Sequence, residues 1–339
     1  MTLEPHNQNK TIERAGLALR QGKLVVFPTE TVYGIGAASN NPNAVAKLYE
    51  VKKRPQFNPL IVHCANKEMA FKLVKVTKTA KQLGDIFWPG PLSLVLTCLD
   101  NSPICSLARA GLDSVALRVP SDPICKKLLE IAGMPIVAPS ANPSGKLSPT
   151  KVNHLDKALI SHCTEVIDAG TCSAGIESTI IDARNEAPVI LRTGPITNLD
   201  IKTQANMNCL YSKSTQGNKP IAPGQLKSHY APFAKVRINA TNKKKGEIFI
   251  GFNTPNADLH LTESGDLIEA AAKLFDMLHV ADKLNPVSIA VAPIPNIGLK
   301  ILIFIELRKI CILVTSRYSN PFFENSSHTF SGIINLMKF

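Results

Sequence analysis

The sequence predicts an α/β protein that contains a mixed sheet and is built from two domains. Short apolar segments of strand length alternate with segments of helical spacing and with Gly- and Pro-rich turns. The chain has 339 residues, which is long for one average domain. Between residues 206 and 232 the composition shifts to Ser, Lys, Asn, Gln, Gly and Pro without hydrophobic periodicity, which indicates a linker.

The elements of the larger domain follow from hydrophobic spacing before the linker. Ile12, Ala15 and Ala18 share one helical face, and Gly22 is placed to end that helix. Helices are therefore expected at residues 11–21, 43–51, 69–83 and 123–132. Strands are expected at residues 24–27, 60–64, 92–99, 114–119, 135–138 and 166–168, with 179–181 and 188–191 as a closing pair.

A second, shorter α/β unit is expected after the linker. Residues 248–252 and 288–292 read as strands, and residues 266–278 as a helix between them. The chain after Leu299 is rich in Ile and Phe and lacks helical amphipathicity. We therefore expect this end of the second unit to be atypical.

Composition narrows the class of protein. The formal net charge is +12, which favours anionic partners such as nucleotides, tRNA or pyrophosphate but also describes an ordinary basic protein. The eight cysteines form no CxxC pair and no zinc spacing, so we expect reduced, structural thiols in a cytoplasmic protein. No run of 18 uncharged apolar residues is present, so no membrane span is expected.

Residues 28–63 form the richest candidate site. The segment PTETVYGIG leaves an apolar strand with hydroxyls, a carboxylate and glycines, and Lys52-Lys53-Arg54-Pro55 supplies three cations before the strand that ends at His63. Arg and Lys at such a turn suit phosphate groups, although the same charges also suit a solvated helix C-terminus. His63 alone would more often be a satisfied core residue.

Further polar groups lie at other strand ends. Residues 140–145 (SANPSG) follow a strand and suit close contact with phosphate or ribose, although a simple turn would also explain them. Arg118 lies inside an apolar strand, where it needs a carboxylate or phosphate partner. Two glycines at Gly34 and Gly36 do not complete a dinucleotide loop, and no P-loop sequence is present. Together these groups predict a pocket that binds anions and aligns two substrates without covalent catalysis.

Six segments in this order resemble the YrdC-like threonylcarbamoyl-AMP synthases. They are PTETVYGIG, KKRPQFNPLIVH, SVALRVP, APSANPSG, GIESTIID and LRTGPI. A further segment, Pro223-Gly224 followed by His229-Tyr230-Ala231-Pro232, is similar to the linker of the long form of this family. The resemblance covers residues 10–299 approximately. It implies a YrdC-like twisted mixed sheet with a concave basic pocket and a smaller Rossmann-like C-terminal domain.

The resemblance implies domains at residues 1–205 and 236–339, joined by a linker at 206–235 that folds over the active site as a lid. The implied reaction joins L-threonine, bicarbonate and ATP into L-threonylcarbamoyladenylate and pyrophosphate, for threonylcarbamoyladenosine modification of tRNA. The threonine carbamate would displace pyrophosphate from the α-phosphorus, so the enzyme would be a nucleotidyltransferase. Mg²⁺ would accompany ATP, and a tRNA-modifying transferase complex would take the product.

The family's functional residues can be placed on this sequence by motif. Threonine would be bound by Thr31, His63, Arg118, Ala138 and Ser178. ATP would be bound by Arg54, Asn58, Ser114, Ser140, Ser148, Arg192 and Tyr230, with Lys52 and Arg54 as the catalytic cations. No side chain is assigned to a metal.

Two departures from the family pattern stand out. Lys53 occupies a position that is usually glycine in the phosphate loop, and the chain after Leu299 replaces a polar, Ala- and Arg-rich helix. We expect the second change to affect the stability of the second domain and not the chemistry.

Two other functions compete with the synthase. An RNA-binding YrdC-like module would fit the positive charge and could contact tRNA, but one Trp and five Tyr offer little aromatic surface for stacking bases. A carbamoyl-transfer domain of hydrogenase maturation would need zinc-finger cysteines, which the chain lacks. Threonine-dependent ATP turnover separates these functions.

Overall fold

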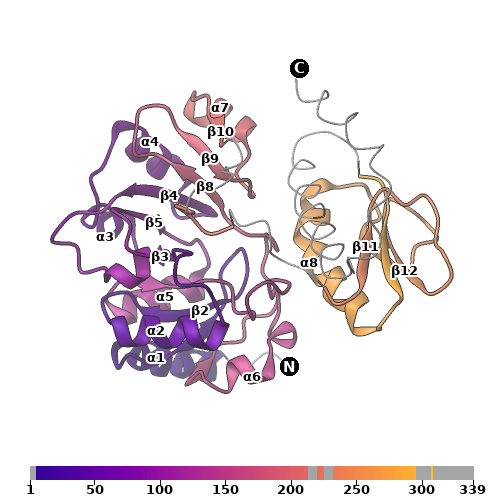
Figure 1. Cartoon of the computed structure of the whole chain (residues 1–339), viewed down its shortest axis with the longest axis horizontal. Coiled ribbons are helices and arrows are strands. Elements are labelled where there is room, and N and C mark those ends of the chain that lie inside the picture. The colour runs from indigo at the N-terminus through magenta and orange to yellow at the C-terminus, as the bar shows by residue number, and fades with distance from the viewer. Residues whose placement is uncertain (1–4, 213–219, 225–231, 295–306, 308–339) are drawn as a thin grey trace, which may run out of the picture.

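The computed structural model of the chain describes residues 5–212, 220–224, 232–294 and 307 (Figure 1). The described strands form a ten-stranded mixed sheet and a separate four-stranded sheet. This confirms the predicted α/β class with two sheet-containing units. The domain boundaries at residues 205 and 235 stay predictions.

The large sheet has the strand order β10-β9-β8-β4-β5-β3-β6-β2-β1-β7. Its strands are β1 (Val25–Phe27), β2 (Gly34–Ala38), β3 (Ile61–His63), β4 (Leu92–Thr97), β5 (Ser114–Arg118), β6 (Ile136–Val137), β7 (Glu165–Val166), β8 (Thr179–Asp182), β9 (Val189–Arg192) and β10 (Leu210–Tyr211). Strands β3 and β5 run parallel at its centre, whereas β4 pairs antiparallel with β5.

The helices of this unit pack on the sheet at both ends. They are α1 (Pro5–Arg20), α2 (Pro42–Lys52), α3 (Lys67–Phe71), α4 (Lys78–Phe87), α5 (Pro123–Ala132), α6 (Lys157–Ile160) and α7 (Asn198–Ala205), with short 3₁₀ turns η1 (Ser106–Arg109) and η2 (Val152–His154). In Figure 1, α1, α2 and α5 lie together at one end of the unit and α4 and α7 at the other. Helices α1 and α5 bury Leu19, Leu128 and Leu129 against Phe27 of β1.

Local signals explain the best-predicted element. The helix expected at residues 123–132 is confirmed as α5, because Asp122 accepts a hydrogen bond from the Cys125 N–H at its start and Gly133 ends it at φ 66°. Both signals stand in the sequence next to the helix that they bound.

The single helix expected at residues 69–83 is wrong. Two short helices, α3 and α4, replace it, because Asn66 and Thr77 each cap a new helix start. Between them the backbone pairs with the end of β4: Lys75 N–H donates to Thr97 O and Leu99 N–H to Leu73 O. This long-range pairing interrupts a local pattern that continues in the sequence.

Alternation along three neighbouring strands divides their side chains between two faces. Val62, Leu94 and Leu117 point into the main apolar core, where they meet α2 and α4. Ile61, Val95 and Ala116 lie on the opposite face in a small apolar cluster that includes Ala222. His63, Ser93 and Arg118 share the parity of that second set, so the strands present them on the face away from the main core.

The second unit is a parallel sheet with one long helix. Its strand order is β11-β14-β12-β13, and every pairing is parallel. The elements are β11 (Lys235–Arg237), β12 (Glu247–Phe252), β13 (Leu259–Thr262), α8 (Leu267–Lys283) and β14 (Ser288–Val291). Figure 1 shows α8 on the side of this sheet that faces the first unit. The strands β11 and β13, like β2 and β10, were not among the sequence predictions.

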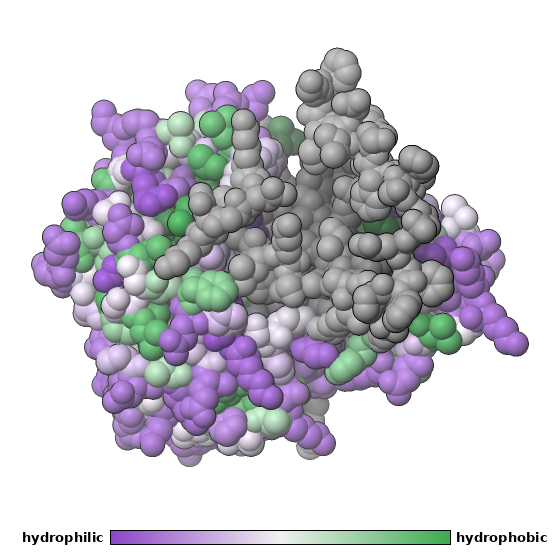
Figure 2. All heavy atoms as spheres, viewed as in Figure 1, coloured by the Kyte–Doolittle hydropathy of each residue, from purple (hydrophilic) through white to green (hydrophobic). Residues whose placement is uncertain are grey.

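The coloured part of the face in Figure 2 is mainly hydrophilic, with apolar residues scattered among the polar ones. In the part of the chain that the structure describes, no helix has the length and hydropathy required to cross a bilayer.

Candidate active site

A single pocket gathers most of the predicted site residues. Nine of the thirteen line it: Thr31, Lys52, Arg54, His63, Arg118, Ala138, Ser140, Ser178 and Arg192. They come from strands β3, β5 and β9, from the end of α2, from the loops after β1 and β6 and from the residue just before β8. Segments more than 150 residues apart in sequence therefore meet at one place.

Two of three polar side chains that share one register of the sheet, His63 and Arg118, line the pocket. His63 of β3 lies opposite Arg118 of β5, and Ser93 of β4 lies opposite the same arginine. All three are buried. Because they occupy matching positions on adjacent strands, the sheet fixes their spacing.

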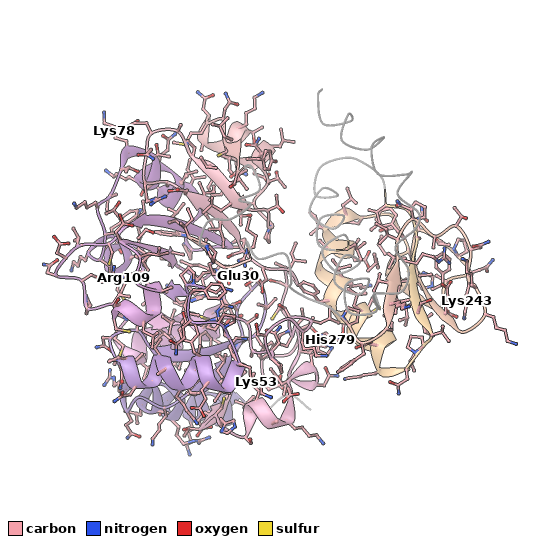
Figure 3. All side chains as sticks on the ribbon, viewed as in Figure 1. Glu30, Lys53, Lys78, Arg109, Lys243 and His279 are labelled. Carbon is pink, nitrogen blue, oxygen red and sulfur yellow. The ribbon has the colours of Figure 1, made fainter. Side chains whose placement is uncertain are left out.

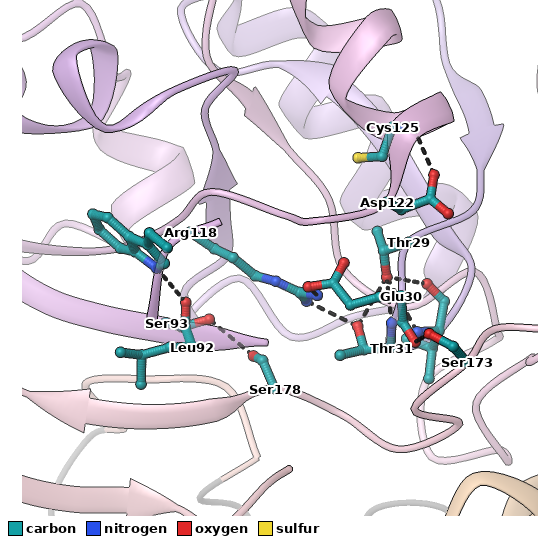
Figure 4. Close-up of polar contacts among 12 residues, drawn as sticks. Thr29, Glu30, Thr31, Leu92, Ser93, Arg118, Asp122, Cys125, Ser173 and Ser178 are labelled. Carbon is teal, nitrogen blue, oxygen red and sulfur yellow. Dashed lines mark hydrogen bonds and ion pairs between the residues drawn. The ribbon is translucent and has the colours of Figure 1, made fainter. Parts of the chain in front are cut away.

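Arg118 is held by partners that precede β2. Its Nη2 forms an ion pair with Glu30 Oε1 at 2.7 Å, and its Nη1 donates to Thr31 Oγ1 at 2.8 Å (Figure 4). Thr29 Oγ1 lies 2.8 Å from Thr31 Oγ1 and donates to Val32 O. The Arg118 Nε finds no hydrogen-bond partner among the described residues. A guanidinium fixed on one edge can present its remaining N–H groups to a ligand carboxylate.

His63 lies beside Arg118 as a neutral imidazole. Burial, with the positive charge of Arg118 acting in the same direction, lowers the pKa of His63 to about 3. Its Nδ1 is buried without a hydrogen-bond partner among the described residues. An uncharged ring at this point can donate or accept a hydrogen bond without adding repulsion to the arginine.

Lys52 is the buried cation on the other side of the pocket. Its Nζ donates to Ser140 O at 2.5 Å and to Asn142 O, and Ser144 N–H donates to Lys52 O at 2.9 Å. These bonds tie α2 to the SANPSG loop. Burial lowers the pKa of Lys52 to about 7, Arg54 acts in the same direction, and Glu177 opposes them.

Lys53, the residue that replaces the usual glycine, adopts a left-handed conformation with φ 51° and ψ 41°. It ends α2, and its N–H donates to Glu50 O and Tyr49 O. The turn therefore forms with lysine in place of glycine. It brings Arg54 to the pocket, where Arg54 also donates to Asn58 O and Pro59 O and so bridges its own loop.

Arg192 and Glu177 form a second charged pair beside Ser178. Arg192 pairs through Nη1 with Glu177, and its Nη2 and Nε donate to Ser178 Oγ and Ser178 O, each at 3.0 Å. Ser178 Oγ also lies 2.8 Å from Ser93 Oγ (Figure 4). Gly224 packs closely against Arg192, since a Cβ at position 224 would lie 2.8 Å from Arg192 Cδ. Its φ of +84° also favours glycine.

Four predicted residues do not line the pocket or fall outside the description. Ser148 does not line the pocket, but its hydroxyl donates to Glu177 Oε1 at 3.0 Å, and Glu177 does line it. Asn58 and Ser114 are buried, and their side-chain polar atoms have no hydrogen-bond partner in the described part of the chain. Tyr230 lies outside the described residues, as do residues 213–219 and 225–231 of the lid predicted at 206–235. The binding roles of all thirteen residues stay predictions.

The structure adds polar residues that the motif carry-over missed. Glu30, Ser93 and Glu177 each contact a predicted site residue, and Asn142 lines the pocket. The buried Arg118 was a signal that a carboxylate must lie nearby. Which carboxylate it is depends on the fold, because Glu30 and Arg118 are far apart in sequence.

Side-chain geometry shows no metal centre among the described residues. Within residues 5–212, 220–224, 232–294 and 307, no group of three or more His, Cys, Asp or Glu side chains could hold a metal ion. The cations that line the pocket instead suit direct contact with anionic ligands.

Fold and site together define a YrdC-like α/β protein with a second domain. A family model described as "Telomere recombination", whose members include Sua5, YciO and YrdC, matches residues 17–194, and the model "Threonylcarbamoyl-AMP synthase, C-terminal domain" matches residues 195–304. The chain belongs to the threonylcarbamoyl-AMP synthase family in its two-domain form.

Individual relatives agree with this membership. The chain is 41% identical over 240 residues to a threonylcarbamoyl-AMP synthase of Bacillus subtilis, covering 70% of this chain and 69% of the relative. It is 36% identical over 313 residues to the synthase of Pyrococcus abyssi, covering 86% and 91%. Two solved structures of P. abyssi Sua5, one of them complexed with L-threonine, superpose with TM-scores of 0.81 and 0.80 at 34% identity. They cover 93% and 89% of this chain and 97% and 94% of theirs.

Proposed function

We propose that this protein joins L-threonine, bicarbonate and ATP into L-threonylcarbamoyladenylate and releases pyrophosphate, as a nucleotidyltransferase that serves tRNA modification. The observation that carries the proposal is the arrangement of charges in one pocket. Arg118 and His63 lie at one register of the sheet, whereas Lys52, Arg54 and Arg192 come from other segments that line the same pocket. This arrangement suits an amino acid and a nucleotide bound side by side.

The threonine side of the site would be built around Arg118. The free edge of this guanidinium would bind the substrate carboxylate, and Thr31, His63 and Ser178 would orient the rest of the molecule. A P. abyssi relative has been solved in complex with L-threonine, which supports this substrate. The amine nitrogen would form a C–N bond with the carbon of bicarbonate, and water would leave to give the carbamate.

The nucleotide side would stabilise charge on the leaving group. A carbamate oxygen would form the new bond to the α-phosphorus as the bond to pyrophosphate breaks, and the electron pair would move to the pyrophosphate oxygen. Lys52, Arg54 and Arg192 would offset that negative charge, and the two bound substrates would be held in line. Mg²⁺ would arrive with the triphosphate and supply further compensation. The product would pass to a tRNA-modifying transferase in the cytoplasm.

Pyrophosphate release tests this proposal directly. The purified chain should release pyrophosphate from ATP only when threonine and bicarbonate are both present. Arg54→Ala should lower this rate at least about tenfold, because a cation next to the phosphates is lost. Release that does not depend on threonine would contradict the proposal, and RNA binding without turnover would favour the alternative module.

A further inference from the structure

Helix α8 of the second domain contacts residues 148–153 of the first domain, a segment that is hydrogen-bonded through Ser148 to Glu177 of the pocket. His279 Nε2 lies 3.1 Å from Ser148 O, and Lys283 Nζ donates to Asn153 O at 3.0 Å. Because a carbonyl oxygen only accepts, His279 carries its proton on Nε2. Figure 3 shows His279 on the side of the second domain that faces the first.

Apolar packing supports the same contact. Three first-domain residues belong to the apolar core of the second domain: Val32, Leu147 and Ile176. Each is the chain neighbour of a predicted or observed site residue, namely Thr31, Ser148 and Glu177. The core of the second domain therefore includes the backbone segments that carry these site residues.

Gly175 shows how closely the two domains approach. It has φ +64°, and a Cβ at this position would lie 1.9 Å from Ala272 O of α8. No side chain fits there, so backbone meets backbone two residues before Glu177. A contact this tight transmits the position of α8 to the loop that carries Glu177.

A chain of polar contacts continues from His279 into the pocket. Ser148, whose carbonyl accepts from His279, donates its hydroxyl to Glu177 Oε1 at 3.0 Å. Glu177 pairs with Arg192, and Arg192 donates to Ser178 Oγ. Each contact in this chain joins buried or partly buried groups. Little water is available there to replace a lost contact, so a displacement of Ser148 is passed on to Glu177 and Arg192.

His279 is itself held in place by its neighbours on both domains. Its ring stacks on His154 with centroids 4.0 Å apart and planes 15° apart. Asp276 lies 3.3 Å from His154 Nε2 and 2.6 Å from Lys151 Nζ. Thr150 N–H donates to His154 Nδ1, which leaves Nε2 as the protonated nitrogen that faces Asp276.

We propose that His279 is a positioning residue for the nucleotide side of the active site, which it orders from the second domain through Ser148, Glu177 and Arg192. The proposal rests on the proposed function. It assigns to α8 a part in ATP binding, whereas the direct partners of Arg118, Glu30 and Thr31, include no residue of α8.

The test compares His279→Ala with wild type in the full chain. The KM for ATP should rise about 3- to 10-fold, the range that corresponds to one lost hydrogen bond. The KM for threonine should stay within about twofold. His279→Gln, which keeps an N–H donor, should restore most of the ATP affinity. Asp276→Asn, which weakens the hold on His154, serves as a second variant if His279→Ala does not fold.

Two controls separate positioning from a general loss of stability. Lys273→Ala removes an exposed ion pair on the same helix, and Lys243→Ala removes one at the outer edge of the domain (Figure 3). Both should leave the KM for ATP unchanged. An unchanged KM in His279→Ala, or equal rises for ATP and threonine, would overturn the proposal. ATP affinity measured by calorimetry keeps the test valid if wild type shows no threonine-dependent turnover, a result that would count against the proposed function alone.

Discussion

Individual charged residues in the pocket are paired with partners that the sequence does not place beside them. Arg118 and Arg192 each form an ion pair with one glutamate, Glu30 and Glu177 respectively. These side chains are almost fully buried, so each carboxylate offsets a charge that would otherwise be costly to bury. The pairs also leave only part of each guanidinium free for ligands.

Removing the charge of Glu30 should therefore have a large effect. Glu30→Gln leaves the Arg118 guanidinium buried without a counter-charge and should lower the free energy of unfolding by about 3 kcal/mol. Urea denaturation measures this loss. The matched control is Glu165→Gln, which removes the partner of the exposed Arg14 and should have a much smaller effect. Equal losses in the two variants would show that burial of the Glu30–Arg118 ion pair does not increase its contribution to the free energy of unfolding.

Lys52 should make ATP binding depend on pH. With a pKa of about 7 in the free protein, this lysine is mostly neutral at pH 8. A bound triphosphate raises that pKa, so binding should take up close to one proton at pH 8 and affinity should fall as pH rises above 7. Calorimetry in buffers of different ionisation enthalpy measures the uptake. Lys52→Arg stays charged and should abolish it, whereas no uptake by wild type would refute the shifted pKa.

At the scale of elements, sequence signals worked where both ends of an element are marked locally. Helix α5 has its capping residues in adjacent positions, and the strands β4, β5 and β8 carry continuous apolar runs. Strand β2 was missed because Gly34 and Gly36 were considered only as part of a dinucleotide loop. The strand needs small residues because it packs closely against β1. A Cβ on Gly36 would lie 2.6 Å from Phe27 Cε1.

The site residues likewise divide into those that local motifs identify and those that they do not. Motif matching found the cations and hydroxyls, which have distinctive types and spacings. It did not find Glu30 and Glu177 as their partners, because ion pairing across the sheet depends on register between strands that are distant in sequence. Ser148 was expected in the ATP site, and its hydroxyl donates to Glu177, a residue that lines the pocket, so its binding role stays a prediction.

The end of α2 offers a test of backbone strain. Lys53 has φ 51°, a conformation that is unfavourable for a residue with a Cβ. Lys53→Gly should raise the free energy of unfolding by about 0.5–1 kcal/mol, after the greater flexibility of glycine in the unfolded chain is counted. Thermal denaturation measures the gain. As a control, Lys47→Gly inside the same helix should lower the free energy of unfolding by about 1 kcal/mol. A loss of stability in both variants would contradict the inference that Lys53 is strained.

For the molecule as a whole, buried neutral histidines should set the acid limit of stability. Burial lowers the pKa values of His63 in the first domain and His154 at the domain interface to about 3. The unfolded chain binds protons at these rings near pH 6.5, so stability is fully present above that pH and is lost as pH falls toward 3. Each ring should contribute a slope of up to about 1.4 kcal/mol per pH unit.

Denaturation curves between pH 7 and pH 4.5 check this dependence. His154→Gln should reduce the slope by the share of one histidine, and the double change with His63→Gln should reduce it by two. The exposed His162 provides the control, since its replacement by Gln should leave the slope unchanged. A slope that stays the same in all three variants would assign acid unfolding to other groups.

The shared apolar core has a practical consequence for anyone who wants to shorten this protein. Cutting the chain after residue 205 would remove α8 and leave Leu147 and Ile176 facing water beside the pocket. Such a fragment would self-associate through this newly exposed apolar surface. A usable minimal enzyme would need polar replacements at both positions, together with a new anchor for the Ser148 backbone.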